Sequence, residues 1–132
     1  MSVPLTDTAR RILDGKNFAV VATVNEDGSP HTSVVWVERR DDDTIVFSST
    51  TKRRKVRNLD RDPRVSLSIF DLSDPYTAVD ITGTAELIPD PDKKLPDKLG
   101  HKYLGQDFQG EPEDVKRYVV RITPEKVTSF SA

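Results

Sequence analysis

Residues 18–37, FAVVATVNEDGSPHTSVVWV, decide the fold class. Phe18 to Val24 is a continuous apolar and β-branched run, which is typical of a strand buried on both faces. Asn25-Glu26-Asp27-Gly28 is a turn signal, because Gly28 can take the positive φ that a tight hairpin requires. Thr32 to Val37 forms a second β-prone run directly after it. This stretch therefore predicts an antiparallel hairpin.

Further strands are predicted on the C-terminal side of the hairpin, each from an apolar or alternating run. They are Thr44–Ser48, Val65–Phe70, Ala78–Leu87, Val119–Ile122 and Val127–Phe130. Gly83, inside one of these runs, predicts a bulge or a close backbone approach. Strands at this spacing, with only short helices between them, favour an antiparallel barrel of the α+β class that is mainly β.

Three short helices are predicted between the strands. The first is capped by Thr6 or Asp7 and ends at Gly15. The second, Lys52–Leu59, is capped by Thr50 or Thr51. The third lies within Pro91–Leu104, where Leu95, Leu99 and Tyr103 share one face, and Pro96 either kinks it or makes it start late.

The composition sets limits on function. The 132 residues are expected to form a single domain, 1–132, and the absence of cysteine excludes disulfides, thiolate metal sites and cysteine nucleophiles. Two histidines are too few for a metal site. No apolar run has the length of a signal peptide or a membrane span, so we expect a cytoplasmic protein without a membrane partner. A net charge of -2 argues against nucleic-acid binding.

The charge is unevenly distributed along the chain. Thr51 to Arg64 holds seven basic residues and two acidic ones, a local charge of +5. Glu86 to Asp114 holds eight acidic residues and four lysines, a local charge of -4. Such local asymmetry indicates a specific anionic ligand better than the total charge does.

The basic segment has the chemistry of a phosphate site. Hydroxyl side chains precede a helix start, whose free N–H groups favour an anion; they belong to Ser48, Ser49, Thr50 and Thr51. Arg54 and Lys55 follow in the first helical turn and supply charged donors. The alternative is a solvated helix face, which is the commoner origin of a run of charges.

The stretch FSSTTKRRKVRNLDRDPRVSL, residues 47–67, resembles the split-barrel superfamily of pyridoxamine-phosphate oxidases and their coenzyme F420 relatives. Within it, the chain is most similar to the F420-dependent split-barrel reductases of the B class. The resemblance rests on an Arg-Lys pair followed by Asn-Leu and Asp-Pro. Weaker blocks follow in the same order along nearly the whole chain: ATVNEDGSPHTSVVWV, VDITGTAEL and RYVVRITPEKVTSF.

The resemblance implies a split β-barrel and a set of cofactor contacts. The Arg-Lys pair, here Arg54 and Lys55, would hold the cofactor phosphate. The strand that begins at His31 would lie along the ring, mostly through its backbone: His31, Thr32, Ser33, Val34 and Val35. The end of the third strand would bond the ring edge or ribityl chain: Ser48, Ser49 and Thr50. A further segment would come from the second protomer of a homodimer, with the cofactor in the interface: Tyr76, Ala78 and Val79.

The implied function is hydride transfer from a reduced deazaflavin, coenzyme F420, to an unsaturated organic small molecule. The strand ends at His31 and Trp36 lack the basic residues typical of the FMN oxidases, and Lys52, Arg53 and Arg57 can meet the polyglutamate tail that FMN lacks. FMN in the same fold and a non-catalytic cofactor carrier are the alternatives. No catalytic residue is identified, because the cofactor itself supplies the chemistry.

Overall fold

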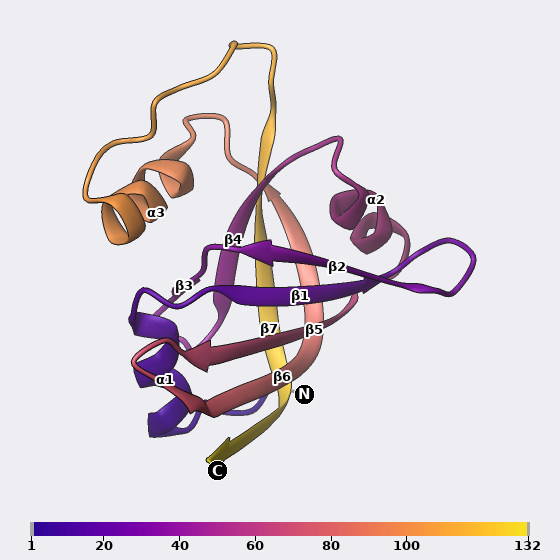
Figure 1. The fold of residues 1–132 in the computed structure, drawn as a ribbon. Coiled ribbons are helices and arrows are strands. Elements are labelled where there is room, and N and C mark those ends of the chain that lie inside the picture. Colours follow the sequence, from indigo (N-terminus) through magenta and orange to yellow (C-terminus); the bar gives the residue numbers. More distant parts are fainter. Residues whose placement is uncertain (1, 132) are drawn as a thin grey trace.

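The computed structural model describes residues 2–131, which form one seven-stranded antiparallel sheet with three short helices (Figure 1). The strand order is β2-β1-β5-β6-β7-β4-β3. The strands are β1 (Ala19–Val24), β2 (Pro30–Val35), β3 (Glu38–Arg39), β4 (Ile45–Thr50), β5 (Arg64–Asp71), β6 (Asp74–Pro89) and β7 (Arg117–Ser131). The predicted α+β, mainly β split barrel is confirmed.

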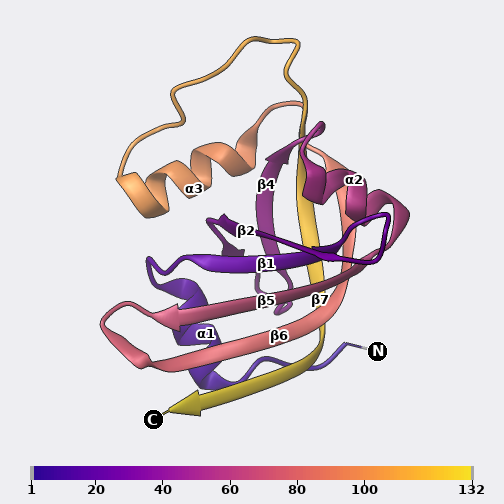
Figure 2. The ribbon, with the colours of Figure 1, turned by 45° about the vertical axis from the view of Figure 1, so that its right-hand side comes forward.

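Two long strands give the sheet its curl. β6 and β7 pair over most of their length, and both bend as they cross the molecule (Figure 2). Their register shifts between Thr82 and Gly83, and a Cβ at Gly83 would lie 2.0 Å from the carbonyl oxygen of Thr123. Only glycine allows this approach. The bulge and close contact expected at Gly83 are both present.

The core fills the inside of this curled sheet, and two helices cover it. Helix α1 (Asp7–Asp14) inserts Ala9, Ile12 and Leu13, all fully buried. As predicted, Thr6 caps α1, accepting a hydrogen bond from the Ala9 N–H at 3.1 Å. Helix α2 (Arg54–Arg61) buries Val56 and Leu59 elsewhere along the sheet, near β1 and β6. These contacts fix where α2 begins, which matters for the site below.

Several strands differ from the sequence-based expectations, and β3 was not expected at all. β1 alternates between inward and outward side chains, and Val20 is 41% exposed, so the strand is not buried on both faces. The hairpin strand starts at Pro30 and ends at Val35. The last two predicted strands are one strand, β7, because Pro124 lies at the register shift beside Gly83, where its missing N–H breaks no regular pairing.

Helix α3 (Lys94–Leu104) packs on the outside of the sheet. Its predicted face of Leu95, Leu99 and Tyr103 is buried against Val46 of β4 and Val119 of β7. Pro96 lies in the first turn, where its lack of an N–H is tolerated, so the helix starts late instead of kinking. The Tyr103 ring also stacks on Trp36, with ring centroids 5.0 Å apart. This packing places α3 beside the end of β2.

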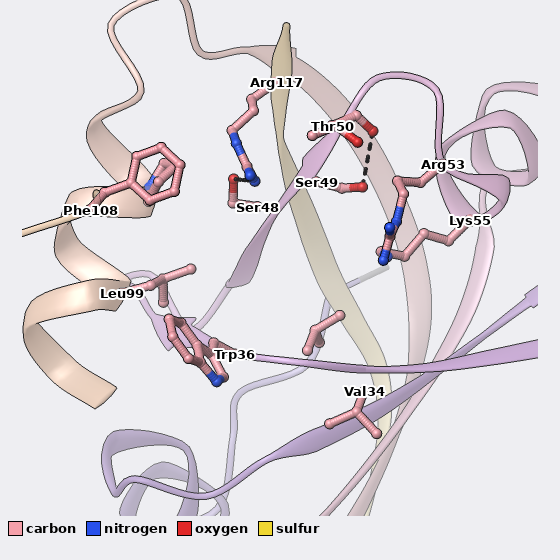
Figure 3. Close-up of a pocket in the computed structure, with 12 residues that line it drawn as sticks. Val34, Trp36, Ser48, Ser49, Thr50, Arg53, Lys55, Leu99, Phe108 and Arg117 are labelled. Atoms are coloured by element: carbon pink, nitrogen blue, oxygen red, sulfur yellow. Dashed lines mark hydrogen bonds between the residues drawn. The ribbon is translucent and has the colours of Figure 1, made fainter. Parts of the chain in front are cut away.

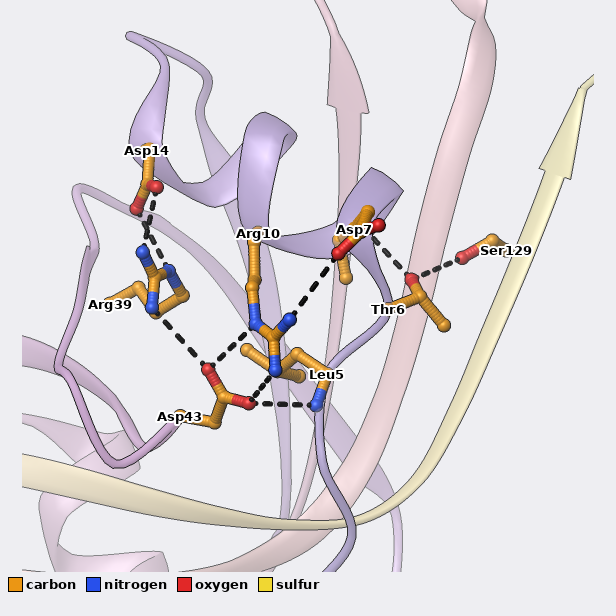
Figure 4. Close-up of polar contacts among 9 residues, drawn as sticks. Leu5, Thr6, Asp7, Arg10, Asp14, Arg39, Asp43 and Ser129 are labelled. Atoms are coloured by element: carbon orange, nitrogen blue, oxygen red, sulfur yellow. Dashed lines mark hydrogen bonds and ion pairs between the residues drawn. The ribbon is translucent and has the colours of Figure 1, made fainter.

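A charged cluster ties α1 to the turn between β3 and β4 (Figure 4). The Asp43 carboxylate accepts hydrogen bonds from the Leu5 N–H at 3.1 Å and from Arg10 Nη2 at 2.7 Å. Arg39 contacts Asp43 at 3.4 Å and Asp14 at 2.9 Å. The hydrogen bond from Arg10 is the main reason that the pKa of Asp43 falls to about 2. We call Asp43, Arg10, Arg39 and Asp14 the Asp43 cluster.

Candidate functional site

A pocket of about 360 Å³ opens where the ends of β2 and β4 face α3 and the start of α2 (Figure 3). Its volume lies at the lower end of the range for small-molecule sites. One side is polar and the other apolar, and three cationic side chains reach it. The lining residues are Val34, Val35, Trp36, Ser48, Ser49, Thr50, Arg53, Lys55, Pro96, Leu99, Phe108 and Arg117. We call it the basic pocket.

Lys55 is the most unusual residue of the basic pocket. It is only 6% exposed, and no described residue forms an ion pair or hydrogen bond with its ammonium group. Burial lowers the pKa of Lys55, and the positive charges of Arg53 and Arg117 lower it further. An unpaired buried cation is costly, so the site has the character of one built for an anion.

The backbone at the start of α2 adds donors to the same place. Arg53 occupies the N-cap position in an extended conformation and makes no side-chain cap, so the predicted caps Thr50 and Thr51 are wrong. The backbone N–H groups of Arg54 and Lys55 donate to no described acceptor, and the first turn holds no acidic residue. Free N–H groups and the helix dipole both favour an anion at this point.

The hydroxyl groups expected at the end of β4 also line the basic pocket. Ser49 is 3% exposed and donates to the Thr50 carbonyl at 3.0 Å, which leaves its oxygen able to accept. The Ser48 hydroxyl accepts a hydrogen bond from Arg117 Nη1 at 3.1 Å. Pairing of β4 with β7 explains this contact, because Ser48 lies opposite Val119 and Thr50 lies opposite Arg117.

Of the residues predicted to contact a cofactor, six line the pocket together: Val34, Val35, Ser48, Ser49, Thr50 and Lys55. Arg54 does not. It is exposed, and its charge acts on Asp27 in the β1–β2 turn, where it is a minor cause of a lowered pKa after the hydrogen bonds from Ser29. The neighbouring Arg53 lines the pocket in its place. The helix begins at Arg54, two residues later than the expected Lys52, so Arg53 lines the pocket and Arg54 does not.

The other predicted residues lie outside the pocket lining. His31, Thr32 and Ser33 occupy the earlier part of β2, where the Ser33 hydroxyl is buried without a partner. Tyr76, Ala78 and Val79 lie near the start of β6, apart from the pocket, so in one copy of the chain they do not contribute to it. Tyr76 is 69% exposed, whereas the Val79 side chain packs in the core.

The structure adds residues that sequence reasoning did not assign to the site. Arg117 reaches the pocket from β7, and Phe108 comes from the segment between α3 and β7. Leu99 and Pro96 were expected only as parts of a helix. Trp36 also lines the pocket. No local motif marks Arg117, because its position depends on the pairing of distant strands.

Within residues 2–131, no group of histidine, cysteine, aspartate or glutamate side chains is arranged to hold a metal ion. The same stretch contains no helix of sufficient length and apolar character to cross a bilayer. The polar groups that line the basic pocket are cationic side chains and hydroxyls.

Solved structures with this fold include an F420 reductase, which is 28% identical with a TM-score of 0.83 over 96% of this chain and 98% of that one. A conserved hypothetical protein of Mycobacterium tuberculosis is 23% identical, with a TM-score of 0.79 over 98% of this chain and 86% of its own. At that identity the likeness concerns the fold alone.

Curated relatives include the pyridoxine/pyridoxamine 5'-phosphate oxidase of Citrobacter koseri, 37% identical over 67 residues. That match covers 51% of this chain and 30% of the relative, so the chain spans under a third of the relative's length. The family described as pyridoxamine 5'-phosphate oxidase matches residues 5–131, nearly the whole chain. The curated oxidase and the solved F420 reductase are both oxidoreductases by name. On the strength of this match, the protein belongs to the pyridoxamine 5'-phosphate oxidase family.

Proposed function

We propose that the protein is an oxidoreductase that binds coenzyme F420 in the basic pocket and reduces an unsaturated organic acceptor. The F420 reductase, similar over almost the full length of both chains, supports the deazaflavin. The curated oxidases match only half of this chain. FMN in the same site is the alternative cofactor, because both carry a phosphate that the basic pocket suits.

The observation that carries this proposal is the unpaired Lys55. The unpaired Lys55 ammonium, the Arg53 side chain and the free N–H groups of Arg54 and Lys55 lie at the start of α2, with both side chains lining the basic pocket. Together they match the acceptor oxygens and negative charge of a phosphate group. A bound phosphate would offset the unfavourable free energy of burying Lys55, so ligand binding should stabilise the folded protein.

The remaining walls suit a flat conjugated ring. Val34 projects from β2 and is 66% exposed, and Trp36 and Leu99 add apolar surface. The chemistry that a reduced deazaflavin would supply here is hydride transfer to one carbon of a conjugated double bond. The other carbon would take a proton from water, so the acceptor would gain two electrons and the cofactor would be oxidised. The protein's own residues bind and orient the ring, which is the usual division of labour.

We further propose that two copies of the chain complete the site. The outer face of the sheet carries exposed apolar residues on adjoining strands: Val20 pairs with Val34, and Phe70 and Phe130 flank the buried Ala78. Contiguous exposed apolar surface is typical of an interface. Tyr76 and its neighbours lie outside the pocket lining of their own chain, so a second copy would have to bring them to it. Sedimentation analysis tests the dimer directly.

Titration of the purified protein with F420 and, separately, with FMN tests the cofactor, using the fluorescence of each ligand. We expect F420 to bind more tightly than FMN. Lys55→Gln should weaken binding of the preferred cofactor by about tenfold or more, because a charged hydrogen bond is lost. Lys126→Gln removes the same charge from an exposed position of β7 outside the pocket lining and serves as the matched control. Tight FMN binding without F420 binding would contradict the proposal.

Turnover separates an enzyme from a carrier. The loaded protein should oxidise reduced F420 when conjugated acceptors are added, and the loss of reduced cofactor can be followed by absorbance. A carrier would bind the cofactor with the same affinity but leave it reduced with every acceptor.

A further inference from the structure

The basic pocket has a second cationic end that the phosphate does not need. Arg53 and Lys55 approach from α2, whereas Arg117 approaches from β7 on the side of α3 (Figure 3). Ser48, Ser49 and Thr50 of β4 lie between them in the view. No carboxylate is among the lining residues. The pocket thus presents positive charge at two separate places.

The Arg117 guanidinium is held in position by its neighbours and still has N–H donors without a partner. Its Nε contacts both carboxylate oxygens of Glu111 at 2.9 Å, and its Nη1 donates to Ser48 at 3.1 Å. The guanidinium also lies over the Phe108 ring, 5.2 Å from its centre. Nη2 has no hydrogen-bond partner among the described residues. A fixed guanidinium with an unused donor edge is suited to a carboxylate.

Glu111 does not cancel the positive charge of this end. The same carboxylate contacts Lys93 Nζ at 3.4 Å, so it is shared between two cations. Hydrogen bonding from Arg117 lowers the pKa of Glu111, which therefore stays ionised at neutral pH. A second carboxylate, that of Asp97, accepts a hydrogen bond from the Phe108 N–H at 3.0 Å, but neither Glu111 nor Asp97 lines the basic pocket, whereas Arg117 does.

Apolar surface adjoins Arg117 on the same side of the pocket. Phe108 and Leu99 lie near it, and Trp36 follows toward β2 (Figure 3). A ligand that uses this end has a flat apolar body and an acidic group that meets the guanidinium. The cationic pair at α2 remains available for the cofactor phosphate.

We propose that Arg117, with Phe108, forms a second anion subsite that selects acceptors bearing a carboxylate next to a conjugated apolar body. This proposal rests on the proposed function, since it names the class of acceptor for the same pocket. Arg117 is a substrate-binding residue here, distinct from the phosphate-binding residues Arg53 and Lys55.

The chain contains a single tryptophan, Trp36, and it lines the pocket, so its fluorescence reports occupancy directly. The probes are a matched pair, cinnamate and its methyl ester, which differ in the acidic group. Each is titrated into the protein with and without bound cofactor. The wild-type protein should prefer the acid over the ester by about tenfold, the effect of a charged hydrogen bond.

Arg117→Gln should abolish the preference for the acid while changing F420 and FMN affinity by no more than about twofold, and Arg117→Lys should retain part of it because the charge remains. Lys55→Gln should have the opposite pattern, weakening cofactor binding and sparing the preference. Thermal melting of each variant checks that it is folded.

Equal binding of acid and ester by the wild-type protein would overturn the second subsite. So would an Arg117→Gln variant that loses F420 affinity but keeps its acid preference, since Arg117 would then serve the acidic tail of the cofactor. Failure of the proposed function is a separate result, in which neither F420 nor FMN binds the wild-type protein while the acid preference is measured independently.

Discussion

The Asp43 cluster and the basic pocket are both groups of charged residues at the edges of one sheet, and they are built in opposite ways. In the Asp43 cluster, Arg10 and Arg39 are both paired with carboxylates. In the basic pocket, Lys55 is buried deeper than either arginine and has no carboxylate partner among the described residues. The first arrangement holds α1 on the barrel, whereas the second leaves charge for a ligand.

The difference shows how to separate structural charges from functional ones. A paired buried ion stabilises the fold on its own, and its pKa moves to favour the charged form, as for Asp43. The pKa of an unpaired buried ion shifts to favour the neutral form, as for Lys55. The desolvation of that charge destabilises the fold until an anion binds. Counting charges along the sequence does not separate the two cases.

The largest expected effect comes from breaking the Asp43 cluster. Asp43→Asn should lower the free energy of unfolding by about 3 kcal/mol, because two arginines lose their shared carboxylate. Asparagine suits the test, since it tolerates the positive φ of 64° at this position. Denaturant unfolding measures the change, and Asp41→Asn, an exposed neighbour, is the control. Equal stability of the two variants would show that the cluster adds nothing.

The same cluster predicts a dependence of stability on acid. The pKa of Asp43 is about 2 in the folded protein and near 3.8 when unfolded, so its contribution is full above about pH 4. That contribution falls as the pH drops toward 2. Unfolding curves across this range should show the stability difference between wild type and Asp43→Asn shrinking. A constant difference from pH 5 to pH 2 would contradict the pairing.

Substitution of two adjacent arginines tests which of them binds the phosphate in the basic pocket. Arg53→Gln should weaken binding of the phosphate-bearing cofactor by about tenfold, the value of one charged hydrogen bond. Arg54→Gln removes the same charge from an exposed position outside the lining, and it should change affinity by no more than about twofold. Ligand fluorescence titration compares the two. A larger loss of affinity in Arg54→Gln than in Arg53→Gln would assign phosphate binding to Arg54, as the resemblance implied.

The smallest effect is expected from Lys55 in the absence of ligand. Lys55→Met should leave the apo protein at least as stable as wild type at pH 7, because a buried unpaired charge is removed. The folded-state pKa of Lys55 lies below its ordinary value of 10.5, so any stability gain should vanish as the pH rises toward that value. Thermal melting without and with FMN checks both states. A clear loss of apo stability would mean that Lys55 has a structural partner.

Much of the fold was predictable because its signals are local. The hairpin around Gly28, the face shared by Leu95, Leu99 and Tyr103, and the close approach at Gly83 each depend on a few neighbouring residues. The start of α2 was not predictable in the same way. Val56 and Leu59 must face the barrel, and this packing sets the helix phase more strongly than the hydroxyls that precede it.

The sequence by itself predicted the antiparallel barrel and the basic segment at the start of a helix, and it indicated Lys55 as a candidate site residue. Only the tertiary structure decided which arginine accompanies Lys55 and that Arg117 joins from β7, more than sixty residues away in the chain. The physical reason is that a run of charges in the sequence shows only which residue types are present. Helix phase and strand pairing decide which way each side chain points. Pairing of Thr50 with Arg117 is a property of the folded sheet, and no run of neighbouring residues encodes it.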